Sequence, residues 1–105
     1  MSGHNYILVG HEPVEEPDLL KWAKWFENAP GRIVKQEQIG EYRVSTVFLG
    51  MNHNFGDGAP LLFETMVFGG DQEEDGEYQK RCSTWDEAEA MHAQAVAWVI
   101  EEELY

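Results

Sequence analysis

Among the side chains of types that acid–base chemistry uses, three are the candidates for such a role: Glu64, His53 and His92. Glu64 is the most unusual of them, because its same-face neighbours on a strand would be apolar: Leu62, Met66 and Phe68. Burial among such neighbours raises the pKa of a carboxyl group, which is one way to make a general acid or base. Exposure at a sheet edge, or a structural ion pair with Arg43 on the preceding strand, explains the same carboxylate, and all three interpretations stay open.

His53 stands near the start of a stretch, residues 52–60, that is rich in Asn, Gly and Asp. Loops on a rigid hairpin often carry binding residues, and the candidates here are His53, Asn54, Phe55 and Asp57. The same composition is typical of any long turn, because these residues supply positive φ and local hydrogen bonds. Phe55 is the better indication of binding, since a large apolar side chain in such a loop must fold under it or face a partner.

Glu89 and His92 are spaced i and i+3, which puts both on one face of a helix. A metal ion needs three or four ligands, so His4, His11 or His53 would have to join this pair. A helical histidine that faces a sheet is more often a hydrogen-bonded core residue. We therefore expect no metal site and no cofactor.

Cys82 follows Lys80 and Arg81, which would lower its thiol pKa if all three side chains faced the same way. On a strand they alternate, so only Lys80 shares a face with the thiol. The sequence contains no phosphate-binding loop, dinucleotide-binding motif or zinc-protease motif. Because no catalytic set is complete, the residues favour a protein without catalysis.

The apolar periodicity predicts the elements that must position these residues. Helices are expected at residues 18–29, with an apolar stripe that includes Trp22 and Phe26, and at residues 84–102. Thr84 and Glu87 have the spacing of a capping box at the start of the second helix. Strands are expected at residues 6–9, 32–38, 42–51, 61–70 and, as a short edge strand, 78–83, with loops at residues 10–17 and 71–77.

This order, β-α-β-β-β-α, predicts an α+β fold formed by a single domain over residues 1–105. Strands that follow each other in sequence favour an antiparallel sheet of three to five strands. Residues 42–51 and 61–70 should form its central hairpin. Both helices are expected to pack on one face of this sheet.

The charge of the chain restricts its partners. With 20 acidic and 7 basic residues, the formal net charge is −13. So few cations disfavour direct binding to nucleic acid or to an anionic membrane surface. One cysteine cannot form an internal disulfide, and no apolar run has the length of a membrane span, so we expect a cytoplasmic protein.

Three segments resemble a family of small uncharacterised proteins of phages, prophages and bacterial genomes: RVSTVFLGMNHNFG at 43–56, PLLFETMVFGG at 60–70 and STWDEAEAMH at 83–92. The segment WAKWFE at 22–27 is similar to a helix of the same family. Asn52 departs from the usual Asp before the loop histidine, which weakens an acid–imidazole pair there. Met91 stands where a small residue is common, which indicates packing.

The resemblance implies a phage-encoded or phage-derived accessory protein in the host cytoplasm, and it brings no catalytic residues. We expect such a protein to act by binding a host or phage protein, or a second copy of itself. The binding residues would be His53, Asn54, Phe55, Asp57, Glu64 and Arg43. Two alternatives stay open: a small enzyme or ligand-binding protein using Glu64, His53 and His92, and an acidic nucleic-acid mimic or virion component.

Overall fold

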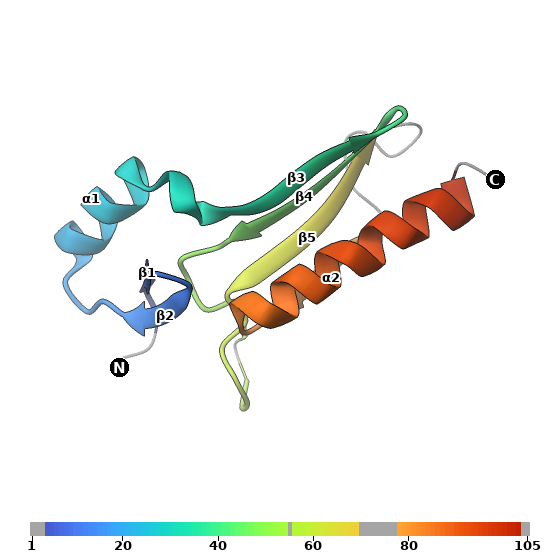
Figure 1. Ribbon diagram of the computed structural model, residues 1–105. Helices are drawn as coiled ribbons and strands as arrows, with labels where there is room; N and C mark the ends of the chain where they lie inside the picture. Colours follow the sequence, from blue (N-terminus) through green and yellow to red (C-terminus); the bar gives the residue numbers. More distant parts are fainter. Residues whose placement is uncertain (1–3, 55, 70–77, 104–105) are drawn as a thin grey trace.

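Two antiparallel sheets and two α-helices form the protein in a computed structural model that describes residues 4–54, 56–69 and 78–103 (Figure 1). The predicted α+β class is therefore confirmed. The larger sheet has four strands in the order β3-β4-β5-β6, and the smaller one pairs β1 with β2.

The four strands of the larger sheet are β3 (Ile33–Ile39), β4 (Tyr42–Phe48), β5 (Phe63–Gly69) and β6 (Gln79–Cys82). The predicted hairpin is confirmed, since β4 pairs with β5 and Thr46 lies opposite Thr65. Both strands are rich in β-branched and aromatic residues, which fit a pleated surface. The predicted edge strand is also present, because β6 pairs with β5 alone.

The smaller sheet differs from the prediction. We expected a strand and then a loop, whereas β1 (Tyr6–Val9) and β2 (Glu12–Glu15) form a hairpin. Gly10 has a φ of 63°, which allows the tight turn between them. Pro13 is tolerated because β2 is an edge strand, where one missing backbone donor costs little.

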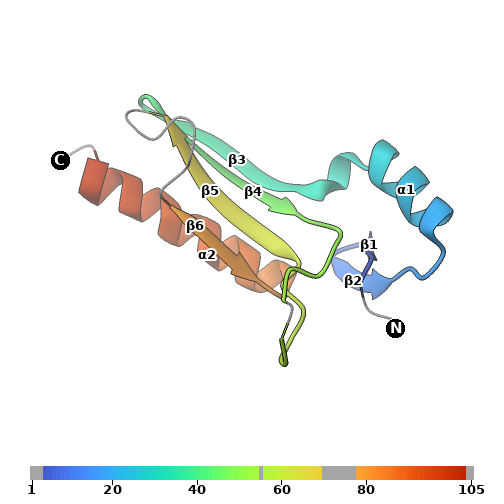
Figure 2. The ribbon, with the colours of Figure 1, turned by 180° about the vertical axis from the view of Figure 1, so that it is seen from behind.

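Helix α2 (Trp85–Trp98) runs along one face of the four-stranded sheet and continues as a π-helical turn at Val99–Glu103 (Figures 1 and 2). Its predicted capping box is confirmed: the Thr84 hydroxyl accepts from the Glu87 backbone N–H, and the Glu87 carboxylate accepts from the Thr84 N–H. This reciprocal pair satisfies two backbone donors that would otherwise lack partners.

Helix α1 (Leu19–Asn28) lies elsewhere than we expected. It packs beside β1, beyond the ends of the β3–β5 strands, so only α2 covers the larger sheet (Figure 1). Trp22 donates its indole N–H to the carbonyl oxygens of Tyr6 and Gly50. Gly50 has a φ of 76°, and a Cβ there would meet the ring of Phe26 at 2.9 Å. Trp22 therefore anchors α1 to the loop after β4, and Trp25 packs against Phe48 at the end of β4, so α1 contacts the end of the sheet without covering its face.

The core lies between α2 and the four-stranded sheet. One cluster joins Phe48, Phe63 and Leu62 to Ala88 of the helix, and a second joins Val44 and Val67 to two helical residues, Ala95 and Val99. After α1, the short 3-10 turn η1 (Pro30–Arg32) leads into β3. No helix of the described residues is both long and apolar enough to cross a membrane.

The register divides the side chains of the sheet between two faces. Phe63, Thr65 and Val67 of β5 are buried on the face that α2 covers, so Glu64 and Met66 point to the other face. We call this other side the outer sheet face. It carries the side chains of Ile33, Gln36, Gln38, Arg43, Ser45, Val47, Glu64, Met66, Phe68, Gln79 and Arg81. No described helix or sheet packs over it.

Candidate functional site

A row of hydrogen bonds runs from the middle of the larger sheet into α2. The hydroxyl oxygens of Thr65 and Thr46 lie 2.5 Å apart on neighbouring strands. Thr46 Oγ1 lies 2.7 Å from His92 Nδ1, and His92 Nε2 lies 2.8 Å from Glu37 Oε1. Three strands and one helix thus contribute one unbroken polar network.

When His92 is neutral, the Glu37 carboxylate at the end of this network determines which atom donates in each hydrogen bond. An ionised Glu37 carboxylate only accepts, so Nε2–H of His92 donates to it. Nδ1 then accepts from the Thr46 hydroxyl, and Thr46 accepts from Thr65. The hydrogen bond from His92 is the main reason that the pKa of Glu37 lies below its ordinary value, with a smaller contribution from the charge of Lys35.

A hydroxyl, an imidazole and a carboxylate in a row are also the parts of a nucleophilic triad. A nucleophile must reach its substrate, yet Thr46 and Thr65 are 0% exposed and His92 only 2%. Both ring nitrogens of His92 are engaged within the protein. His92 is therefore a hydrogen-bonded core residue, as its position on a helix facing a sheet predicts.

A cavity of about 340 Å³ opens beside the exposed end of the network. It lies between β3 and α2, and its walls are Val34, Lys35, Glu37, Glu89, His92, Ala93 and Val96. Lys35 Nζ is 3.5 Å from Glu37 Oε1. The sequence-predicted pair Glu89 and His92 thus faces one cavity.

Glu64 lies on the outer sheet face, away from His92. Its Oε2 accepts from Arg81 Nε at 2.9 Å and from Gln79 Nε2 at 2.8 Å. The partner that we expected, Arg43, instead lies over the Phe68 ring, with its guanidinium carbon 4.6 Å from the ring centroid. The register explains this correction, because β6 places Arg81 directly opposite Glu64, whereas Arg43 lies opposite Phe68.

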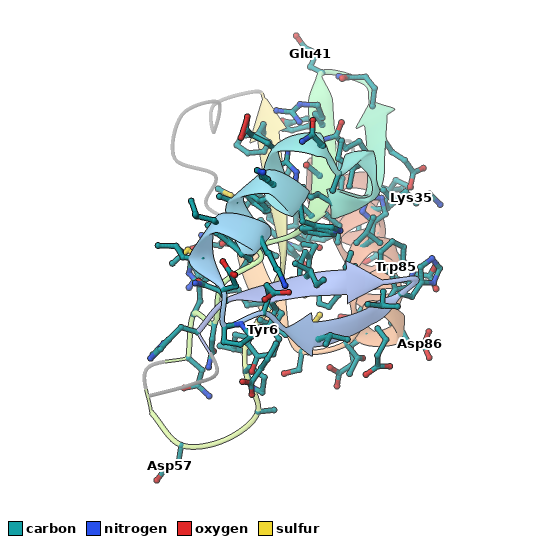
Figure 3. All side chains as sticks on the ribbon, turned by 90° about the vertical axis from the view of Figure 1, so that its left-hand side faces the viewer. Tyr6, Lys35, Glu41, Asp57, Trp85 and Asp86 are labelled. Carbon is teal, nitrogen blue, oxygen red and sulfur yellow. The ribbon has the colours of Figure 1, made fainter. Side chains whose placement is uncertain are left out.

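The loop between β4 and β5 is organised by its own amides. Asn52 Oδ1 accepts from the backbone N–H groups of Asn54 and Leu61. The Asn54 amide donates to the carbonyl oxygens of Asp57 and Ala59. These bonds support the interpretation of Asn54 as a turn residue, and Asp57 lies at the far end of the loop, away from the sheet (Figure 3). Phe55 lies outside the described residues.

Glu64, His53 and His92 do not form one site. Glu64 and His92 lie on opposite sides of the sheet. His53 belongs to the loop after β4, where its backbone N–H donates to the Leu61 carbonyl. In the described part of the chain, no three His, Cys, Asp or Glu side chains are close enough to hold a metal ion. His11, one of the possible metal ligands, stacks on Trp85 with a centroid distance of 3.8 Å.

Cys82 lies in β6 with its thiol partly buried. Burial raises the pKa of this thiol to about 11, and the negative charge of Glu87 adds to the increase. The neighbouring cations, Lys80 and Arg81, do not reverse this effect. A nucleophilic role for Cys82 is disfavoured, because a thiolate is scarce at neutral pH.

Sequence reasoning missed Glu37 and Thr65 as members of the polar network, and Lys35 as the cation beside Glu37. A weak signal existed for Thr65, because two hydroxyl residues, Thr46 and Thr65, interrupt the buried faces of two apolar strands. Glu37 had no such signal, since it alternates with other polar residues in β3.

The outer sheet face differs in charge from the rest of the protein. It holds two arginines and one glutamate, whereas the whole chain carries −13. Its centre contains half-buried apolar side chains from two strands: Val47, Met66 and Phe68. Two predicted binding residues, Arg43 and Glu64, lie on this face.

Comparisons with protein-family models, with curated proteins and with solved structures give no match to this chain.

Proposed function

We propose that this chain is a phage-encoded or phage-derived accessory protein that acts in the host cytoplasm by binding another protein. The outer sheet face is the binding surface, and the chain has no catalysis of its own. One observation carries this proposal: a sheet face that no described element covers is cationic and apolar in a strongly acidic protein. The proposed phage origin and the host cytoplasm as its location follow from the resemblance to phage and prophage proteins.

The chemistry of the outer sheet face fits a protein partner. Arg, Met and aromatic side chains are enriched at protein interfaces, and Arg43, Met66 and Phe68 are neighbours here. The guanidinium of Arg43 is already held over Phe68, so less side-chain freedom is lost on binding. A partner of matching chemistry presents carboxylates around an apolar centre, because opposite charges speed association and select the partner.

Catalysis is the weaker interpretation for two reasons. The hydroxyl that would act as a nucleophile, on Thr46, is fully buried. The acid–base set that the sequence offered, Glu64, His53 and His92, is divided between two sides of the sheet and a loop. The nucleic-acid mimic is not carried further, because its acidic segment at residues 71–77 lies outside the described residues.

Capture from a lysate of phage-infected host cells tests the proposal. The wild-type protein is immobilised beside Arg43→Glu, which reverses a charge on the outer sheet face, and Met66→Asp, which adds one to its apolar centre. Lys21→Glu is the matched control, since Lys21 is exposed on α1. Quantitative mass spectrometry should find a protein that the wild type and Lys21→Glu retain and that both face variants lose.

Two results would contradict the proposal. In one, every captured protein binds all four forms equally, which would place the interaction elsewhere. In the other, no protein is enriched over an empty matrix. Sedimentation equilibrium of the wild type separately tests whether the partner is a second copy, because Arg43→Glu should then convert a dimer into a monomer.

A further inference from the structure

We infer that the cavity between β3 and α2 binds a small organic cation, an ammonium or guanidinium group on a short hydrocarbon chain. This site is separate from the outer sheet face, because it lies on the side of the sheet that α2 covers. It is a ligand site in addition to the proposed protein-binding surface, and either can be present without the other.

A local irregularity of β3 builds one wall of the cavity. Adjacent residues of a regular strand point to opposite faces, yet Val34 and Lys35 both line the cavity. The register of β3 against β4 shifts between Ile33 and Lys35, which is the mark of a β-bulge. A bulge redirects a side chain and is common next to binding sites. Here it brings an apolar and a charged side chain to the same opening.

Helix α2 builds the opposite wall. Glu89, Ala93 and Val96 are spaced i, i+4 and i+7, so they form one stripe along the helix. His92 also lines the cavity and is fixed by its bonds to Thr46 and Glu37. The cavity therefore has apolar side chains on both walls and carboxylates from both elements.

The charges in the cavity favour a cation. Glu37 and Glu89 contribute two carboxylates, and Lys35 contributes one ammonium group, which lies 3.5 Å from Glu37. The carboxylate of Glu89 has no hydrogen bond or ion pair with any other described residue. One carboxylate at the cavity is thus left for a ligand. The charge of −13 on the chain further attracts cations and repels anions.

The size and the apolar walls define the rest of the ligand. About 340 Å³ is near the lower end of small-molecule sites, which span roughly 300–1,000 Å³. Val34, Ala93 and Val96 offer hydrocarbon contacts, so a bare metal ion or ammonium ion would leave these walls unused. A short aliphatic chain with one cationic end satisfies both parts of the site.

Three probes with the same six-carbon chain test this inference: hexylammonium, hexan-1-ol and hexanoate. Each is titrated into the full-length protein labelled with ¹⁵N, and backbone amide shifts are followed by NMR. Hexylammonium should give saturable shifts at Lys35, Ala93 and Val96. Hexan-1-ol should bind at least tenfold more weakly, since a hydrogen bond to a charged group is worth about tenfold or more. Hexanoate should give no saturable shifts.

Glu89→Gln is the main variant, because Glu89 is exposed and its loss leaves the core intact. It should weaken hexylammonium binding about tenfold. Glu27→Gln on α1 removes the same charge from an exposed residue that does not line the cavity and should leave the affinity within about twofold, because salt screens exposed charges outside the site. Glu37→Gln removes the second carboxylate of the cavity, the one on β3, and should also weaken hexylammonium binding.

Several results would overturn the inference. Equal weakening by Glu89→Gln and Glu27→Gln would show attraction to the acidic chain in general. If hexan-1-ol or hexanoate bound as tightly as hexylammonium, the site would not select a cation. Shifts confined to residues outside β3 and α2, or no saturable shifts, would show that this cavity is not a binding site.

Discussion

Thr46 Oγ1 lies 2.7 Å from His92 Nδ1, inside the layer between β4 and α2. This bond joins the centre of the sheet to the helix that covers it, in a region where Thr46 is 0% exposed. Buried polar groups are costly without partners, so a satisfied network fixes how the helix sits on the sheet. The same burial separates this network from substrates, and for this reason we assign it a structural role.

Thr46→Val should destabilise the protein more than Thr65→Val. Removing the Thr46 hydroxyl leaves two buried groups, Thr65 Oγ1 and His92 Nδ1, without this partner, at a cost of about 1–3 kcal/mol each, whereas removing the Thr65 hydroxyl deletes one bond worth about 0.5–1.5 kcal/mol. The free energy of unfolding from urea titrations measures both. The double variant should lose less free energy of unfolding than the two single variants together, because no Thr65 hydroxyl is then left unpaired. Equal costs for the single variants would contradict the network.

The sequence predicted the elements whose signals are local. The capping box at Thr84 depends on residues three positions apart, and the β4–β5 hairpin depends on two neighbouring runs of β-branched and aromatic residues. The core role of His92 was also predictable, because its helix has an apolar stripe on the same side. Each of these features is determined by residues close together in the chain.

The remaining features depend on which segments meet in space. Glu37 is 55 positions from His92, so no local pattern joins them. Arg81 rather than Arg43 holds Glu64 because β6 adds to the free edge of β5, and one sequence gives no strand order. Helix α1 has an apolar stripe that fits a sheet face equally well, yet Trp22 finds its partners at Gly50 and Tyr6.

Glu37 should make the stability depend on pH below about 4.5. Its pKa is lowered in the folded protein, chiefly by the hydrogen bond from His92, relative to an ordinary value of 4.5. The contribution of the ionised carboxylate is therefore complete above that value and is lost as the pH falls through the folded pKa. Urea titrations between pH 5.5 and 3 should show the difference between wild type and Glu37→Gln shrinking with acidification.

Lys35→Met provides the control for this pH dependence. The charge of Lys35 is a smaller cause of the lowered pKa of Glu37 than the hydrogen bond from His92. This variant should therefore keep most of the wild-type dependence on pH. A difference between wild type and Glu37→Gln that stays constant from pH 5.5 to 3 would contradict the assignment.

Cys82 should react slowly with a thiol reagent such as dithionitrobenzoate. With a pKa of about 11, its thiolate fraction at pH 8 is about 0.1%, against about a quarter for an ordinary thiol. The greater nucleophilicity of a high-pKa thiolate recovers about tenfold, so the native protein should react at least about tenfold more slowly than the urea-unfolded chain. Similar rates in the two states would show that the thiol is exposed and unperturbed.

Arg81→Met should destabilise the protein more than the same substitution at Arg43. The Glu64 side chain is only 12% exposed, so loss of Arg81 leaves a poorly solvated carboxylate, at a cost of about 1–3 kcal/mol. Arg43→Met removes a cation–π contact with Phe68, which at an exposed site is worth about 0.5–1 kcal/mol. Replacing Glu64 and Arg81 together with Met should cost less than Arg81→Met alone, because no unpaired charge remains. Urea midpoints at unchanged slope measure the series, and a larger cost at Arg43 than at Arg81 would show that Arg43 is the partner of Glu64 in solution.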